Sequence, residues 1–449
     1  ERHQSLYAAL AWSHDLLAPS AQILFRRLAV FPADADLGAI AAICSDEEAS
    51  AAQVETHLAT LLDHSLVHRL PTRGPTRLGM LATIRAFASE MLRTHAEQPQ
   101  MQEHYARYYH RLAVREHHAA TTGQQIQALQ HLDQERTNLD TALDWFLATD
   151  ELEAGLECAW ALLWYWIIRG RFADGRRRFE TLLAQAQARQ LVLAPKTYAH
   201  ALAAIGRLAF HQSDYGHAEP LVHEALQLFM ELNDGPGQIH TWQSLGLIAE
   251  KRSRFDDAIR YYKAALEQTD FLMDSSTRGM LLMGLGNVAY LRGALEEAAS
   301  YYNECIAQFR GGGDIHLLAK SLGNLATLMT MHSEFEQAHS LYQEALVMLQ
   351  AVGDKEGVAL TYMNQGTVLR KLGDLDESMS LIMQAIEIHR IIGHQRGVAV
   401  TLQALADLYV VRDELPAALE AYQESLAMLE TLGSQQGVMN GLHKIAQVL

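Results

Sequence analysis

The sequence predicts a mostly α-helical chain whose C-terminal half is an α-solenoid of about six 40-residue repeats. Two observations predict it: small residues recur at a fixed step of 40, and a bulky series keeps the same step. A strict period of this length is typical of one supersecondary unit that is copied and stacked. The small series is Gly206, Gly246, Gly286, Ala326, Gly366 and Ala406, and the bulky series is Tyr215, Phe255, Leu295, Phe335, Leu375 and Leu415.

The first 98 residues show a mixed pattern of helices and strands. Helical spacing of apolar residues predicts helices over 5–17, 20–31 and 55–64. Residues 65–70 are expected to form a strand, 71–75 a tight turn and 77–80 a returning strand. Three helices followed by a β-hairpin predict a winged helix-turn-helix domain over residues 1–98.

Residues 99–197 are helical in pattern and rich in aromatic residues. Trp160 and Trp164 stand four apart, which places them on one helix face, where such a stripe is more often core than ligand site. Phe172 and Gly175 resemble the bulky and small spacing of the later repeats. We expect this segment to be a connector that begins the helical stack with irregular repeats, ahead of the regular superhelix over 198–449.

Each 40-residue unit reads as two amphipathic helices. In the second unit, Trp242, Leu245 and Ile248 mark the first helix, and Phe255 opens the second. Gly246 and Ala258 are small, which predicts that the two helices cross closely there. A helix pair of this kind cannot bury its apolar face alone, so successive pairs must stack.

These residues resemble the tetratricopeptide repeat (TPR) family. The family pattern has a small residue in the first helix, an aromatic residue near the turn and Ala early in the second helix, matched by Gly246, Phe255 and Ala258. The resemblance covers about 198–437, with units six residues longer than usual. It implies that the first helices line a concave groove that binds a protein, a peptide or a small ligand.

Counting from each small residue predicts which side chains line this groove. Asn324 and Asn364 hold the same place in adjacent repeats, and an amide both donates to and accepts from an extended peptide backbone. Methionines would give an adaptable apolar floor. The alternative is that the methionines pack between helices and the amides satisfy local groups. The predicted groove residues are His240, Gln243, Met280, Met283, Asn287, Tyr290, Lys320, Asn324, Thr327, Met363, Asn364, Thr367 and Arg370.

The runs LAWSHDLLAPSAQILFRRLAVFP, LATLLDHSLVHRL and RLGMLATIRAFASEML resemble the winged helix of bacterial STAND-class signalling ATPases with an NB-ARC module, of the AfsR/MalT type. The resemblance implies an upstream nucleotide-binding domain that takes ATP or ADP in a longer parent protein. Where relatives carry a Met-His-Asp nucleotide sensor, this chain has Leu81 and Ala82. We therefore expect no direct polar contact to nucleotide from this segment.

Two interpretations of the winged helix remain open. In one, Arg69, Arg73 and Arg77 on the wing touch DNA phosphates. In the other, the domain is an intramolecular switch element. Residues 1–95 hold 8 basic and 10 acidic side chains, and a DNA reader is usually clearly basic, so the switch element is favoured.

Composition narrows the classes of partner and location. The chain of 449 residues is 49% hydrophobic, carries a net charge of −17 and shows no apolar run of transmembrane length and no signal peptide. Residues 201–449 hold 30 acidic and 17 basic side chains, which disfavours nucleic acid as a partner of the repeats. The three cysteines are far apart and suggest no metal or disulfide framework, so a cytoplasmic protein without a membrane segment is expected.

No phosphate-binding G-x-x-x-x-G-K-[ST] loop, H-E-x-x-H or G-x-S-x-G motif occurs, so we expect no enzyme, cofactor or metal site in this segment. Glu1 in first place and an incomplete last repeat lead us to expect a piece of a longer protein. The predicted function is the sensor arm of a STAND-class regulator. This arm binds an inducer, and the winged helix relays the binding event to the nucleotide-binding domain. A DNA-binding regulator with a TPR ligand domain and a passive TPR scaffold are the alternatives.

Overall fold

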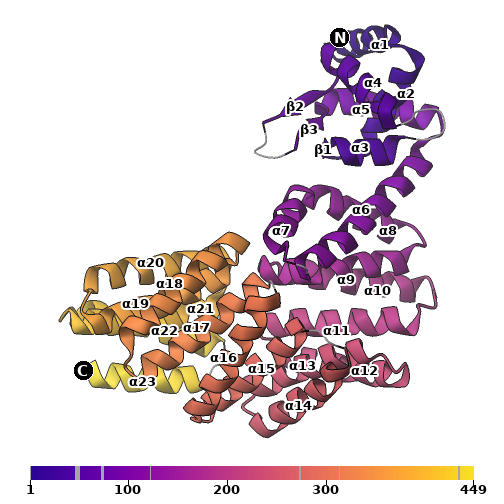
Figure 1. The fold of residues 1–449 in the computed structure, drawn as a ribbon. Helices are drawn as coiled ribbons and strands as arrows, with labels where there is room; N and C mark the ends of the chain where they lie inside the picture. The colour runs from indigo at the N-terminus through magenta and orange to yellow at the C-terminus, as the bar shows by residue number, and fades with distance from the viewer. Residues whose placement is uncertain are drawn as a thin grey trace. The chain divides into compact units, whose positions relative to one another are not determined.

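The computed structural model describes residues 2–45, 51–71, 75–121, 123–272, 275–312, 314–432 and 435–448. These residues form two compact units. Figure 1 labels the helices and strands. Unit 1 comprises residues 1–118, 130–162 and 178–197, and unit 2 comprises 119–129, 163–177 and 198–449. The predicted domain limits at 98 and 197 stay a prediction.

Unit 1 begins with a winged helix. Its helices are α1 (Arg2–Asp15), α2 (Pro19–Arg27), a 3-10 turn (Leu28–Val30), α3 (Leu37–Cys44), α4 (Ala51–Asp63) and α5 (Ala82–Thr94). Its strands β1 (Ala35–Asp36), β2 (His68–Leu70) and β3 (Arg77–Gly79) form an antiparallel sheet in the order β1-β3-β2. Phe25, Ile40 and Leu61 are fully buried and join the helices in one core.

The sequence prediction missed two helices of this domain, α3 and α5, and one strand, β1. Helix α3 lies between the second and third predicted helices, and β1 precedes it. The run over 37–44 is apolar on nearly every side and only eight residues long, so it shows no helical period. Its start is fixed by Asp36, whose carboxylate accepts a hydrogen bond from the Ala39 amide at 2.7 Å. The predicted turn over 71–75 lies largely outside the described residues.

The middle of the chain is helical, as predicted. It consists of α6 (Gln98–Thr121), α7 (Gln125–Gln134), α8 (Arg136–Ala148), α9 (Leu152–Ile168) and α10 (Phe172–Ala188). Trp160 and Trp164 are partly buried and Trp166 is buried. The aromatic residues of α9 therefore serve packing.

Unit 2 holds the repeats. Among the described residues they consist of six helix pairs, followed by one further helix. In each pair, the second helix begins at a residue of the bulky series that starts with Tyr215. The left-handed residue between the two helices also recurs every 40 positions, at Ser213, Ser253, Gly293, Ser333, Gly373 and Asp413. The elements are α11 (Pro195–His211), α12 (Tyr215–Glu231), α13 (Gly235–Lys251), α14 (Phe255–Leu272), α15 (Ser275–Leu291), α16 (Leu295–Gly312), α17 (Ile315–Met331), α18 (Phe335–Val352), α19 (Lys355–Leu372), α20 (Leu375–Ile391), α21 (Gln395–Val411), α22 (Leu415–Thr431) and α23 (Gln435–Val448).

The predicted close crossing of each helix pair is confirmed. A Cβ on Gly246 would lie 2.4 Å from the Tyr262 ring, and one on Gly286 would lie 2.7 Å from the Tyr302 ring. Ala258 and Ala298 on the facing helices are fully buried. The small residues are therefore a steric requirement of the repeat.

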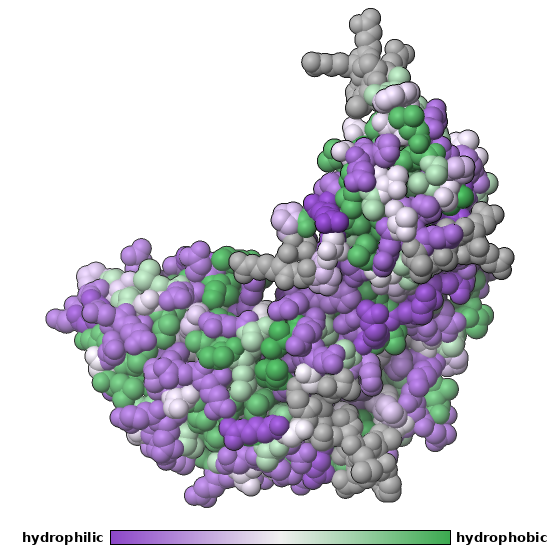
Figure 2. Space-filling model, turned by 45° about the horizontal axis from the view of Figure 1, so that its top comes forward, coloured by the Kyte–Doolittle hydropathy of each residue, from purple (hydrophilic) through white to green (hydrophobic). Residues whose placement is uncertain are grey.

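Within the part of the chain that the structure describes, no helix is both long and apolar enough to cross a bilayer. On the face drawn in Figure 2, hydrophilic side chains alternate with small groups of hydrophobic ones. Scattered apolar groups of this kind are normal on a protein surface.

Candidate functional site

A tyrosine on the second helix recurs in four of the six repeats. Tyr262, Tyr302, Tyr342 and Tyr422 stand on the second helices, at multiples of 40 residues, and all four are buried. The Tyr302 hydroxyl donates to Asn287 Oδ1 at 2.9 Å, and the Tyr342 hydroxyl lies 2.9 Å from Thr327 Oγ1. The Tyr422 hydroxyl donates to Asp407 Oδ1. In each case the partner lies on the first helix, 15 residues earlier.

These bonds fix the polar side chains of the first helices. Asn324 Nδ2 donates to Asn287 Oδ1 at 3.0 Å, which joins the third repeat to the fourth. Burial raises the pKa of Tyr342, and side-chain hydrogen bonding with Thr327, Thr330 and Asn364 opposes that rise. Four predicted groove residues therefore lie in one region of repeats three to five. They are Asn287, Asn324, Thr327 and Asn364.

The thirteen predicted groove residues differ in exposure. His240 is exposed, whereas Gln243 is buried and keeps 7% of its surface, which leaves little of it for a ligand. The other predicted residues are partly buried, which fits both a groove lining and packing between helices. They are Met280, Met283, Asn287, Tyr290, Lys320, Asn324, Thr327, Met363, Asn364, Thr367 and Arg370.

Several of these side chains also serve the repeat interior. Met280 and Met283 pack against the buried cluster around Leu282, which is the packing alternative considered above. The Thr367 hydroxyl donates to the Met363 carbonyl of its own helix at 3.0 Å. The assignment of all thirteen residues to a ligand groove stays a prediction.

A ladder of charges continues the polar row at its C-terminal end. Arg370 Nη2 lies 4.0 Å from Asp407 Oδ2, and Lys444 Nζ lies 2.5 Å from the same oxygen. Three successive repeats are linked in this way. The tyrosine row and this ladder were missed by the sequence analysis. The 40-residue spacing of the tyrosines could have revealed the row.

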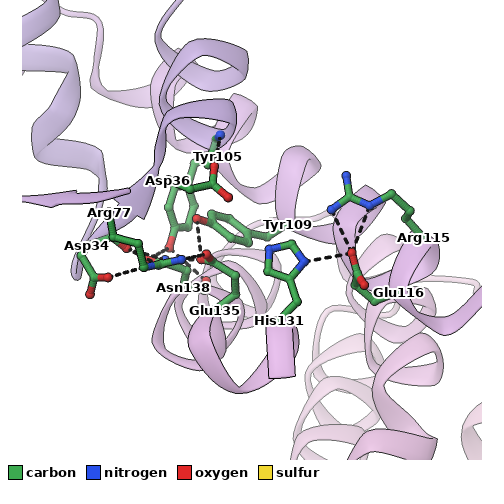
Figure 3. A network of polar contacts seen from close by, with 11 residues as sticks. Asp34, Asp36, Arg77, Tyr105, Tyr109, Arg115, Glu116, His131, Glu135 and Asn138 are labelled. Atoms are coloured by element: carbon green, nitrogen blue, oxygen red, sulfur yellow. Dashed lines mark hydrogen bonds and ion pairs between the residues drawn. The ribbon is translucent and has the colours of Figure 1, made fainter. Parts of the chain in front are cut away.

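Unit 1 contains a second polar network, which joins the winged helix to the helices that follow it (Figure 3). Arg77 of β3 donates to the Asp34 and Glu135 carboxylates, and its Nη2 donates to the Asp34 carbonyl at 2.9 Å. Glu135 Oε2 accepts from the Tyr109 hydroxyl at 3.1 Å and from Asn138 Nδ2 at 2.7 Å. Arg77 is 4% exposed and Glu135 is 1% exposed.

This network contradicts part of the DNA-binding interpretation. Arg77 was a predicted phosphate contact, but its guanidinium points into unit 1 and is held by two carboxylates. Burial acts to lower the pKa of Arg77, yet the hydrogen bonds with Glu135 and Asp34 raise it overall. Arg69 is exposed on β2, and Arg73 lies outside the described residues.

The same network includes a group that could in principle hold a metal. Ligand atoms of Asp36, His131 and Glu135 lie within 4.8 Å of one another. Both Glu135 oxygens already accept bonds from Arg77, Tyr109 and Asn138. The buried carboxylate is thus neutralised by a guanidinium, which leaves little capacity for a cation.

Comparison with known proteins agrees with this architecture. Residues 197–269, 277–351 and 357–431 match the family model described as tetratricopeptide repeat, and residues 17–93 match the one described as winged helix-turn-helix domain. The chain therefore carries a winged helix-turn-helix domain followed by tetratricopeptide repeats.

Candidate HTH-type transcriptional regulators of Mycobacterium bovis and Mycobacterium tuberculosis are each 32% identical to the chain over 203 residues. The match covers 45% of this chain and only 23% of the length of these relatives.

Two solved structures share the fold at low sequence identity. A STAND protein with a tetratricopeptide repeat sensor from Pyrococcus horikoshii aligns with 97% of this chain and 60% of its own, with a TM-score of 0.57 and 16% identity. The Rap conjugation gene regulator of plasmid pLS20, in complex with a Phr peptide, aligns with 73% of this chain and 98% of its own, with a TM-score of 0.52 and 15% identity.

Proposed function

We propose that this chain is the sensor arm of a bacterial signal-transduction regulator of the STAND class. The first-helix face of the repeats binds a protein or peptide inducer in extended form. The winged helix and the connector relay that event to a nucleotide-binding domain, which takes ATP or ADP, elsewhere in a longer protein. The relay is a population shift, because the inducer favours the conformation that it binds more tightly.

One observation carries the binding half of this proposal. Gly323 lies in the middle of α17, and a Cβ built on it would meet nothing within 4 Å. Gly246 and Gly284 on earlier first helices are instead packed against a tyrosine ring. Open space thus lies beside Asn324, an amide suited to bind a peptide backbone. The peptide complex described for the Rap regulator supports this use of the fold.

The relay half is supported by the Arg77 network. The hairpin strand β3 and the helices α6 and α7–α8 meet at a buried ion pair with a fully bonded carboxylate. A buried charge pair of this kind is geometrically demanding, because loss of one partner leaves an uncompensated charge. A displacement of the connector helices would therefore be transmitted to the winged helix.

The test is retention of a random-sequence peptide mixture by the immobilised chain, read out by mass spectrometry. We expect the double variant Asn324→Ala/Asn364→Ala to reduce retention roughly tenfold or more, because about 1 kcal/mol is lost per hydrogen bond. Asn303→Ala removes an exposed amide on the second helix α16 and serves as the matched control. Unchanged retention in the double variant would refute the groove assignment.

The name of the mycobacterial relatives favours DNA binding as the second candidate function. Arg69 is the one described wing arginine that faces solvent. Fluorescence anisotropy with duplex DNA at low and high salt separates the two functions. Salt-dependent binding that is weakened in Arg69→Ala would support the DNA-binding regulator.

A further inference from the structure

Within unit 2, the connector is bonded to repeats four and five, which follow it by 183 to 191 residues. Gln125, the first residue of α7, donates from Nε2 to Asp314 Oδ1 at 3.2 Å, and its Oε1 accepts from the His316 amide at 3.0 Å. Arg169, which follows α9 directly, donates to the Val352 carbonyl at the end of α18. We call the two hydrogen bonds of Gln125 the latch.

The latch is buried at the first turn of α17. Gln125 and His316 are both buried, and His316 Nε2 lies 2.8 Å from Oδ2 of Asp354, which is buried as well. Asp314 and Asp354 also cap α17 and α19, because each accepts from the backbone amide three residues later. The connector is therefore bonded to the groups that fix where the first helices of repeats four and five begin.

The latch covers one end of the α17 face that carries a predicted groove residue. His316, Lys320 and Asn324 follow one another at intervals of four residues, so they share one face of the helix. His316 is buried at the latch, whereas Lys320 and Asn324 are partly exposed. A Cβ on Gly323 would meet nothing within 4 Å. This face of α17 is therefore closed at its first turn and open at its middle.

A second segment of the connector lies against the first repeat. The Phe172 ring stacks on the His211 ring of α11, with 4.8 Å between centroids and 7° between the ring planes. His211 stands one helical turn after Arg207, which lies 80 and 120 residues before the predicted groove residues Asn287 and Thr327. His211 is therefore on the groove side of α11, and the connector contacts that side in two repeats.

We infer that the connector is an intramolecular occupant of the groove, which an inducer must displace from the start of α17. This inference rests on the proposed function and specifies how inducer binding is regulated. The Gln125 amide gives α17 one N–H donor and one carbonyl acceptor, which is what a peptide backbone would offer there. The inducer and Gln125 cannot bond to the same groups at once. The apparent affinity for the inducer is therefore reduced in proportion to the fraction of molecules in which the latch is open.

The experiment changes one atom of the latch. Gln125→Glu replaces the Nε2 donor by an oxygen next to Asp314 Oδ1, so two carboxylates repel each other in a buried place and the latch opens. Retention of a random-sequence peptide mixture by the immobilised chain is measured by mass spectrometry at pH 8, where a glutamate ordinarily carries its charge. We expect retention to rise roughly fivefold to thirtyfold, the range for the loss of one or two hydrogen bonds.

Two matched variants control for the added charge. Gln127→Glu adds the same charge to an exposed position of the same helix and should leave retention at the wild-type level. Asp314→Asn, combined with Gln125→Glu, gives the new carboxylate an amide N–H to accept from. Asn also caps helices well, so α17 keeps its start and retention should return to the wild-type level.

Hydrogen exchange at the first turn of α17 reports on the latch itself, because Gln125 protects the His316 amide. Exchange there should be faster in Gln125→Glu. Gln125→Ala removes both bonds without adding charge, and it keeps the test decisive if circular dichroism shows that Gln125→Glu fails to fold. Faster exchange with unchanged or lower retention would overturn this inference and leave the proposed function standing, as would wild-type exchange in both variants. Retention by neither the wild-type chain nor the variants would refute both.

Discussion

The four repeat tyrosines are chemically alike, but their hydroxyls differ in what they contribute. Those of Tyr302, Tyr342 and Tyr422 are bonded to the facing helix, whereas the position 15 residues before Tyr262 holds Leu247, which offers no polar group. A buried hydrogen bond stabilises modestly, but a buried polar group without a partner costs its full desolvation. The same substitution should therefore have different effects at different repeats.

We expect Tyr302→Phe to lower the free energy of unfolding by about 1 kcal/mol, because Asn287 loses a donor. Tyr262→Phe removes a hydroxyl that has no hydrogen-bond partner among the described residues, and it should be neutral or stabilising. Urea unfolding followed by circular dichroism measures both variants under one condition. Equal losses in the two variants would contradict the assignment of Tyr262 as unpartnered.

At this scale the sequence predicted which residues face each other but not what they bond to. Asn324 was expected to meet a ligand, and the structure shows it donating to Asn287 on the neighbouring repeat. Arg77 was a candidate DNA contact because a wing arginine is usually exposed. Its burial depends on Asp34 and on Glu135, which is 58 residues away, and no local pattern encodes that contact.

At the scale of elements, the repeat helices were predictable and the short elements of the winged helix were not. The second repeat helices begin at the bulky residues that define the series, from Tyr215 to Leu415, because the left-handed turn before each one is equally periodic. Helix α3 lacks such repetition and depends on its Asp36 cap and on burial. Periodicity thus carries information that a single short element cannot.

The glycines of the first helices provide a prediction at this scale. Gly323→Ala should raise the free energy of unfolding by up to about 1 kcal/mol, because Ala favours the helix and its Cβ would enter open space. Gly246→Ala should lower it by about 1–3 kcal/mol, since its Cβ would overlap the Tyr262 ring. Both variants add one methyl group to a glycine within a helix. The difference between their free energies of unfolding in urea therefore reports the packing around each methyl group. Destabilisation by Gly323→Ala would show that the space beside α17 is filled.

At the scale of the whole molecule, the two units have cores of different kinds. Unit 1 surrounds the buried Arg77–Glu135 pair, whereas unit 2 is stabilised by contacts between successive repeats. Repeat arrays gain stability from neighbour to neighbour, and a compact domain gains it from one shared core. Loss of the Arg77–Glu135 ion pair should therefore lower the stability of unit 1 and leave that of unit 2 unchanged.

We expect Arg77→Met to destabilise unit 1 by about 3–5 kcal/mol, because Glu135 is then left as an uncompensated buried charge. The double variant Arg77→Met/Glu135→Met should cost less than the arginine variant alone, since it removes both charges. Hydrogen exchange measured by mass spectrometry resolves the two units. Amides of α5, α6 and α8 should exchange faster in Arg77→Met, whereas those of α13–α22 should keep their wild-type rates. Faster exchange throughout α13–α22 would instead mean that the winged helix and the repeats unfold as one cooperative body, and the relay would then act through global stability rather than through the junction.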